Sequence, residues 1–94
     1  MRRPLVAGNW KMNLSPEAGS ALVTELLPLV AGSSAAVDVV VCPPYTSLAA
    51  VAAVLQGGAV TLGAQNCHWE EEGAFTGEVA PGMLLTVGCQ WVIL

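Results

Sequence analysis

The chain has 94 residues, of which 54% are hydrophobic and 11% are charged, and its net charge at pH 7 is -4. A typical soluble domain has about 25% charged residues, so apolar surface of this chain is expected to face something outside it. Its three Lys and Arg residues form no basic patch, which argues against nucleic-acid binding. Polar residues interrupt every apolar run before the roughly 18 to 20 residues of a membrane span, so no membrane insertion is expected.

The three cysteines Cys42, Cys67 and Cys89 are an odd number without a Cys-x-x-Cys spacing. This pattern predicts reduced thiols and argues against a disulfide framework or a zinc site. No metal ion and no cofactor are expected. The apolar run at residues 5–8 is too short for a secretory signal, so the protein is expected to be cytoplasmic.

The first predicted element is a short buried strand over residues 5–11, which begins apolar and turns polar at Asn9 and Lys11. Side chains alternate between the two faces of a strand. The amide of Asn9 and the ammonium of Lys11 are therefore predicted to point to the same side. Arg2 and Arg3 lie at the other end of this strand, where they are expected to be solvated.

A helix is predicted to follow, because Ser15 offers an N-cap hydroxyl, Pro16 suits the first helical position and Glu17 places an acid in the first turn. Pro28 is predicted to kink or end this helix early. The apolar stripe of the helix is predicted to consist of Ala18, Leu22, Leu26 and Leu29.

Further strands and helices alternate along the rest of the chain. A β-branched strand over 37–42 is closed by two prolines, and a helix capped by Thr46 or Ser47 is predicted to run to Leu55. The remaining predicted elements are a strand over 60–64, a loop over 65–80, a helix over 81–87 and a strand over 90–94. A loop of about sixteen residues is long for a compact domain and is more often functional than incidental.

The order βαβαβαβ with apolar strands predicts an α/β fold with a parallel sheet and right-handed crossovers. Polar residues at the carboxyl ends of parallel strands lie where βα barrels place their active sites. A complete (β/α)8 barrel takes about 250 residues, which is far more than this chain provides.

Five stretches of the sequence match motifs of one known family, in the same order. They are Gly-Asn-Trp-Lys-Met-Asn at 8–13, Cys-Pro-Pro at 42–44, Gly-Ala-Gln-Asn at 63–66, the segment 69–78, and Pro-Gly-Met-Leu at 81–84. The first resembles the phosphosugar-binding strand end of the triosephosphate isomerases, and the third and fourth resemble that family's third loop. The resemblance implies a partial (β/α)8 TIM barrel with helices on its outer face. Residues 1–94 would be a single N-terminal half-barrel fragment.

The resemblance also implies roles for individual residues. Lys11 would be a catalytic and substrate-binding residue whose charge opposes a phosphate, and Asn9 would bind the substrate by a hydrogen bond. On the residue pattern alone, Lys11 could equally be a snorkelling surface lysine, and Asn9 could cap a turn. The family's third loop reaches a partner subunit, which implies dimer contacts by Met12, Thr76 and Glu78.

Other polar residues of the loop have simpler interpretations. The acids Glu70, Glu71 and Glu72 are predicted to form a solvated face. His68 is predicted to be a loop hydrogen-bonder, because the sequence places no carboxylate partner beside it. Cys67 has no activating cation nearby, which argues against a reactive thiol.

The family's electrophilic histidine follows the fourth strand and its glutamate base lies much later, and neither segment is present in a sequence that stops at Leu94. We therefore expect an N-terminal fragment of an enzyme of glycolysis and gluconeogenesis. That enzyme interconverts the triose phosphates dihydroxyacetone phosphate and glyceraldehyde 3-phosphate, and the fragment by itself should be inactive. The alternative is a stand-alone, self-associating, non-catalytic half-barrel module. A nucleotide-binding domain is a weaker alternative, because the sequence lacks a glycine-rich phosphate loop.

Overall fold

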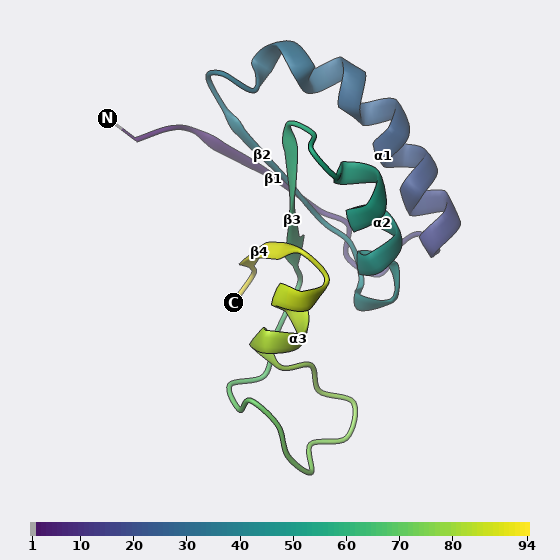
Figure 1. Ribbon diagram of the computed structural model, residues 1–94, viewed down its shortest axis with the longest axis vertical. Coiled ribbons are helices and arrows are strands. Elements are labelled where there is room, and N and C mark those ends of the chain that lie inside the picture. Colours follow the sequence, from purple (N-terminus) through teal and green to yellow (C-terminus); the bar gives the residue numbers. More distant parts are fainter. Residues whose placement is uncertain (1) are drawn as a thin grey trace.

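The computed structural model describes residues 2–94 as one parallel sheet with helices packed on it (Figure 1). Its elements are β1 (Leu5–Asn9), α1 (Pro16–Val30), β2 (Asp38–Cys42), α2 (Leu48–Leu55), β3 (Val60–Ala64), α3 (Pro81–Thr86) and β4 (Cys89–Val92). Short 3₁₀ turns at Ala31–Ser33 and Tyr45–Ser47 follow α1 and precede α2. The four strands are parallel and lie in the order β1-β2-β3-β4, which confirms the predicted α/β fold.

The first strand ends two residues earlier than predicted, at Asn9. Lys11 has a φ of 56°, which is the left-handed region that an extended strand cannot use. The prediction that strand alternation aligns Asn9 with Lys11 is therefore wrong. A turn sets their relative position.

The helix α1 begins as predicted but ends later. The Ser15 hydroxyl accepts a hydrogen bond from the Ala18 N–H at 3.2 Å, and Pro16 occupies the first turn. The helix continues past Pro28 to Val30, so the prediction that Pro28 ends it early is wrong. Proline removes one backbone donor, and here that loss falls in the last turn of the helix.

The apolar stripe of α1 also differs from the predicted one. Leu22 and Leu29 are 44% and 79% exposed, whereas the side of α1 that packs consists of Gly19, Val23, Leu26, Leu27 and Val30. Gly19 lies against the Trp10 indole, and a Cβ at this position would come within 2.9 Å of Trp10 Cζ3. Close packing of the indole on a glycine turns a different face of the helix toward the sheet.

The other boundaries fall close to the predicted ones, and β3 matches its predicted range. Ser47 precedes α2 but does not cap it through its side chain. It is fully buried and donates its hydroxyl hydrogen to the Leu14 carbonyl at 3.2 Å. Arg3 is also not simply solvated as predicted. Its Nε lies 3.2 Å from Asp38 Oδ1, which ties the segment before β1 to the start of β2.

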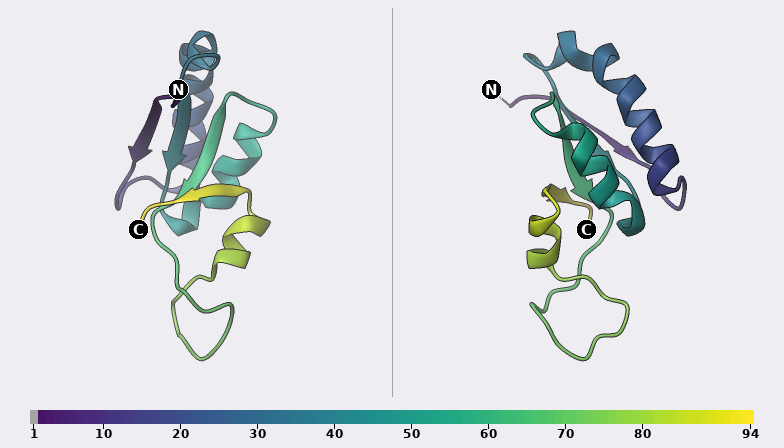
Figure 2. Two further views of the ribbon diagram at one scale, coloured as in Figure 1. Left: turned by 90° about the vertical axis from the view of Figure 1, so that its left-hand side faces the viewer. Right: turned by 45° about the vertical axis from the view of Figure 1, so that its right-hand side comes forward.

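The two long helices α1 and α2 lie side by side on one face of the sheet (Figure 2). The core between this face and the helices contains Val23, Val41, Leu48, Val51, Leu55, Val60 and Leu62. On the opposite face, a Cβ added to Gly63 would lie 2.8 Å from Cys42 Sγ and 3.2 Å from Trp91 Cβ. The Trp91 Nε1–H donates to Thr61 Oγ1 at 3.0 Å. The tryptophan of β4 therefore covers the centre of this second face.

Candidate functional site

The carboxyl ends of β1, β2 and β3 lie together at one end of the sheet, since Asn9 pairs with Cys42 and the strands are parallel. Ligand sites of parallel βα folds lie at the carboxyl ends of the strands. Lys11 follows β1 and Gln65 follows β3, so an ammonium and an amide reach this end of the sheet from strands that are not neighbours.

Asn9 holds the turn that carries Lys11. Its Oδ1 accepts a hydrogen bond from the Lys11 backbone N–H at 2.9 Å, so the alternative interpretation of Asn9 as a turn cap is correct for this oxygen. The amide Nδ2 of Asn9 makes no hydrogen bond within residues 2–94. Asn9 can therefore cap the turn with one atom and donate to a ligand with the other.

Gln65, which follows β3, holds the Lys11 backbone by a hydrogen bond. Its Nε2 donates to the Lys11 carbonyl and to the Cys42 carbonyl, both at 2.8 Å. A non-glycine residue in the left-handed region costs of order 1 to 3 kcal/mol and persists only when its surroundings impose it. Two hydrogen bonds of the Lys11 backbone supply this constraint. Its carbonyl accepts a bond from Gln65, and its N–H donates a bond to Asn9. The sequence pattern by itself predicts no role for Gln65, although a polar residue directly after an apolar strand is a usable signal.

A hollow of about 220 Å³ lies beside Lys11. It is lined by Lys11, Met12, Pro44, Tyr45, Gln65 and Asn66, and Lys11 is the one cation among these six residues. The Tyr45 hydroxyl donates to the Asn66 carbonyl at 2.7 Å. Burial, and secondarily Cys67 and Glu78, raise the pKa of Tyr45, so this hydroxyl stays protonated at neutral pH. The hollow therefore offers a small anionic group one positive charge on a fixed backbone.

The predicted dimer-contact residues lie on two separate segments. Met12 is 93% exposed beside Lys11, whereas Thr76 is exposed in the loop that projects beyond α3 (Figure 1). Neither Thr76 nor Glu78 lines the hollow beside Lys11. Within one chain, the structure therefore places Met12 in the lining of the hollow and leaves Thr76 and Glu78 outside that lining.

His68 packs the inside of this loop. It is 7% exposed, its Nδ1 lies 3.4 Å from Glu78 Oε2, and its ring lies 4.2 Å from Trp69 and 4.3 Å from Phe75 between ring centroids. The sequence-based statement that no carboxylate is placed beside His68 is wrong, because the loop folds back and brings Glu78 to it. The Glu70–72 run is exposed as predicted.

The three cysteines are free thiols. Burial raises the pKa of Cys42 and of Cys89, so both stay protonated at neutral pH. Among residues 2–94, no three His, Cys, Asp or Glu side chains are grouped so that they could hold a metal ion. None of the helices in the same part of the chain combines the length and apolar character needed to cross a bilayer.

Replacing Gln65 by Leu is expected to lower the free energy of unfolding by about 1 to 3 kcal/mol. The Lys11 carbonyl loses its donor, and the Cys42 carbonyl keeps only the Trp10 N–H. Thermal unfolding followed by circular dichroism measures this change. The matched control is Asn66→Leu, since Asn66 is exposed and its backbone carbonyl alone accepts the Tyr45 bond. If both variants unfold alike, the side chain of Gln65 does not hold the strand ends together.

A parallel sheet in chain order, with polar side chains gathered at the carboxyl ends of its strands, defines a protein of the (β/α)-barrel class. The family model described as triosephosphate isomerase matches residues 4–94. The chain belongs to the triosephosphate isomerase family.

Curated relatives are similar over the whole chain. The triosephosphate isomerase of Caldanaerobacter subterraneus subsp. tengcongensis is 50% identical over 94 residues, and that of Herpetosiphon aurantiacus is 54% identical. In both cases the match covers all of this chain and 37% of the relative. The solved triosephosphate isomerase from Bartonella henselae superposes with a TM-score of 0.85 at 36% identity, over 99% of this chain and 38% of that one. The chain thus spans well under half of the length of its relatives and matches their N-terminal part.

Proposed function

We propose that the chain supplies the phosphate-binding corner of a triosephosphate isomerase site. The observation that carries this proposal is the Lys11 backbone, which lies in the left-handed region at φ 56° and is held there by Asn9 and Gln65. Strain retained by specific hydrogen bonds is characteristic of functional positions. In the complete protein, the Lys11 ammonium opposes the substrate phosphate and the Asn9 amide donates a hydrogen bond to the substrate.

The reaction proposed for the complete protein is the cofactor-free interconversion of dihydroxyacetone phosphate and glyceraldehyde 3-phosphate in the cytoplasm. The groups that move the proton lie in other segments of the family's barrel. Residues 1–94 form a single half-barrel unit that binds substrate but does not carry out the chemistry. Met12, Thr76 and Glu78 make the subunit contacts of the complete enzyme.

A chimera tests this proposal. Residues 1–94 replace the matching N-terminal part of one of the curated relatives, and isomerase activity is measured against the unmodified relative purified in the same way. A kcat/KM within about tenfold of the relative, one step of 1.4 kcal/mol in barrier, supports the proposal. A chimera that folds and forms the relative's assembly but has no turnover contradicts it.

The second candidate function, a self-associating module without catalysis, is favoured by the exposed edges of the sheet. All five residues of β1 are exposed, and Val6 is 58% exposed. At the other edge Trp91 and Val92 are 42% and 38% exposed. Unpaired edge strands with apolar side chains recruit other chains.

The purified chain is expected to form dimers or larger assemblies at micromolar concentration. Leaving a few hundred Å² of apolar surface exposed to water costs several kcal/mol of free energy at about 25 cal/mol per Å². This cost is comparable to the whole stability of a small domain. Light scattering after size-exclusion chromatography measures the mass, and dilution should shift the assemblies toward the monomer. A compact monomer that unfolds cooperatively at this concentration would show that the edges need no partner.

A further inference from the structure

The segment that carries Lys11 lies on the surface, so burial does not fix its position. Residues 11–14 are all exposed, and Met12 among them is 93% exposed. Hydrogen bonds at the two ends of the segment must therefore hold it in place. The Lys11 end is held by its two backbone hydrogen bonds. The end that leads to α1 needs a constraint of its own, because Leu14 also has a positive φ, of 74°.

The backbone of Leu14 is strained. In the left-handed region the Cβ of an L-residue lies too close to a carbonyl oxygen, and a residue stays there only when its surroundings impose it. Leucine has no polar side chain that could compensate locally, as the side chains of Asn and Asp do. The Leu14 carbonyl accepts a hydrogen bond from the Ser47 hydroxyl at 3.2 Å, across 33 positions of the sequence. The constraint on Leu14 is therefore a tertiary contact.

Ser47 is well placed to impose this conformation. It is fully buried at the end of the turn Tyr45–Ser47, which follows two prolines whose fixed φ stiffens the chain. A serine before a helix usually accepts a hydrogen bond from the first turn of that helix. The Ser47 side chain makes no such cap on α2, and its hydroxyl is directed to Leu14 instead. A buried donor on a stiff turn therefore holds the far end of the Lys11 segment.

The same turn also holds the loop that follows β3. The Tyr45 hydroxyl donates to the Asn66 carbonyl at 2.7 Å, directly after Gln65, whose side chain binds the Lys11 carbonyl. The turn thus contacts both segments that determine where Lys11 lies, one through Ser47 and the other through Tyr45. Both sets of hydrogen bonds act on the position of one ammonium group.

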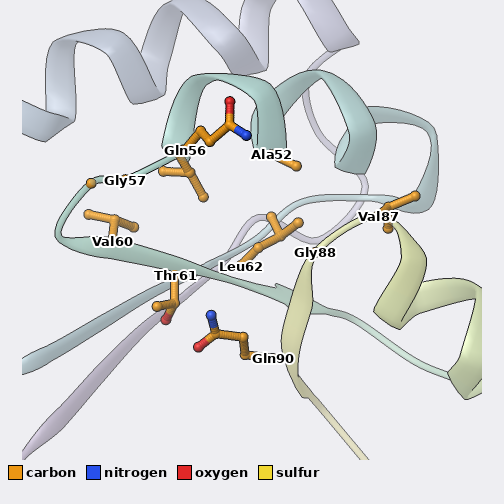
Figure 3. A pocket seen from close by; sticks show the side chains of 11 residues that line it. Ala52, Gln56, Gly57, Val60, Thr61, Leu62, Val87, Gly88 and Gln90 are labelled. Atoms are coloured by element: carbon orange, nitrogen blue, oxygen red, sulfur yellow. The ribbon is translucent and has the colours of Figure 1, made fainter.

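The hollow beside the start of β3 is of a different kind (Figure 3). It measures about 460 Å³ and is lined by the end of α2, the turn after it, β3 and the start of β4. Its lining residues include no charged side chain. The Thr61 hydroxyl in this lining already accepts the bond from Trp91. This hollow offers no charge for an ionic ligand, whereas the Lys11 segment at the carboxyl ends of the strands does.

We propose that Ser47 is a positioning residue for Lys11. Its hydroxyl keeps Leu14 left-handed, which fixes the path of residues 12–14 and, with it, the direction in which the Lys11 side chain leaves the segment. Ser47 acts through the backbone, since it does not line the hollow beside Lys11. A misplacement of about 1 Å in a site can cost about 100-fold in rate, so one buried hydroxyl outside the hollow can matter. The inference rests on the proposed function of Lys11.

Ser47→Ala is expected to lower kcat/KM of the chimera by about 10- to 100-fold, in both kcat and KM. The variant should fold, because the Leu14 carbonyl that loses its donor belongs to an exposed residue and can bond to water. The matched control is Ser34→Ala. The Ser34 hydroxyl also donates to a carbonyl, that of Ala31 at 3.1 Å, but it lies before β2, at the opposite end of the sheet. Its kcat/KM should stay within about threefold of the parent.

Leu14→Gly distinguishes positioning from a general loss of stability. Glycine adopts a left-handed backbone without the Cβ clash, so a glycine at this position no longer needs Ser47 to hold it. In the Leu14→Gly background, Ser47→Ala should therefore lower kcat/KM by less than about threefold. A merely structural role of Ser47 would give the same loss in both backgrounds, because independent effects add.

Hydrogen exchange tests the inference without relying on turnover. Exchange of backbone amides is followed by mass spectrometry in a peptide of the chimera that covers residues 10–14. Ser47→Ala should speed this exchange at least about tenfold, because the Lys11 N–H loses its bond to Asn9 whenever the segment opens. Ser34→Ala should leave the exchange of this peptide unchanged.

Two results would overturn the inference. Ser47→Ala could match Ser34→Ala in either measurement, or it could lose the same kcat/KM with and without Leu14→Gly. The proposed function fails separately. A parent chimera that folds without turnover but shows the expected exchange pattern contradicts the proposed function and leaves the hold of Ser47 on the segment intact. An active chimera that is unaffected by Ser47→Ala contradicts the positioning inference alone.

Discussion

Purified by itself, the 94-residue chain is expected to show no isomerase turnover. Its one histidine is His68, which is buried in the loop beside Glu78 and does not line the hollow at Lys11. A positioned acid or base contributes about 10² to 10⁴ in rate, and the proposed function assigns the electrophile and the base to segments outside these residues. The substrate binding proposed for Lys11 would not replace proton transfer.

A coupled assay at high protein concentration measures this result, with the active chimera diluted to its detection limit as the positive control. The chain should give no signal at the highest concentration tested. The chimera should still be detected at a concentration several orders of magnitude lower. Turnover that follows the chain through every purification step would show that the chemistry resides in residues 1–94.

Lys11→Ala in the chimera is expected to lower kcat/KM by about 10²- to 10³-fold, because it removes a fixed charge that opposes the phosphate and the charge of the transition state. The effect should appear in both kcat and KM. Lys11→Met, which keeps the length of the side chain, should lose as much as Lys11→Ala. Neither Ala nor Met is favoured over Lys in the left-handed backbone region, so the difference in rate measures the ammonium and not the backbone strain.

The control for the loss of a positive charge is Arg2→Ala, since Arg2 is an exposed cation before β1, at the end of that strand away from Lys11. Its kcat/KM should stay within about threefold of the parent, less than one tenfold step of barrier. Circular dichroism should show that every variant folds, because Lys11 is also exposed. If Lys11→Ala too stays within that limit, the role assigned to its ammonium is wrong.

The sequence by itself determined the class of fold and most of the element boundaries. These features depend on neighbouring residues, such as the β-branched run of β2 before its prolines, or the Ser15 cap before Pro16. Local conformation and short-range hydrogen bonds decide them, so a single chain segment contains the information. The family motif at residues 8–13 likewise pointed to Asn9 and Lys11 without a structure.

Only the tertiary structure decided how those residues are held. Lys11 depends on Gln65, which is 54 positions away, and the packed face of α1 depends on the contact of Gly19 with Trp10. His68 meets Glu78 only because the loop folds back on itself. A periodic pattern shows that a helix has an apolar side, but close packing against a neighbouring side chain determines which residues form the buried face. A strained backbone such as that of Lys11 is likewise imposed by its partners across the sheet, which no local pattern encodes.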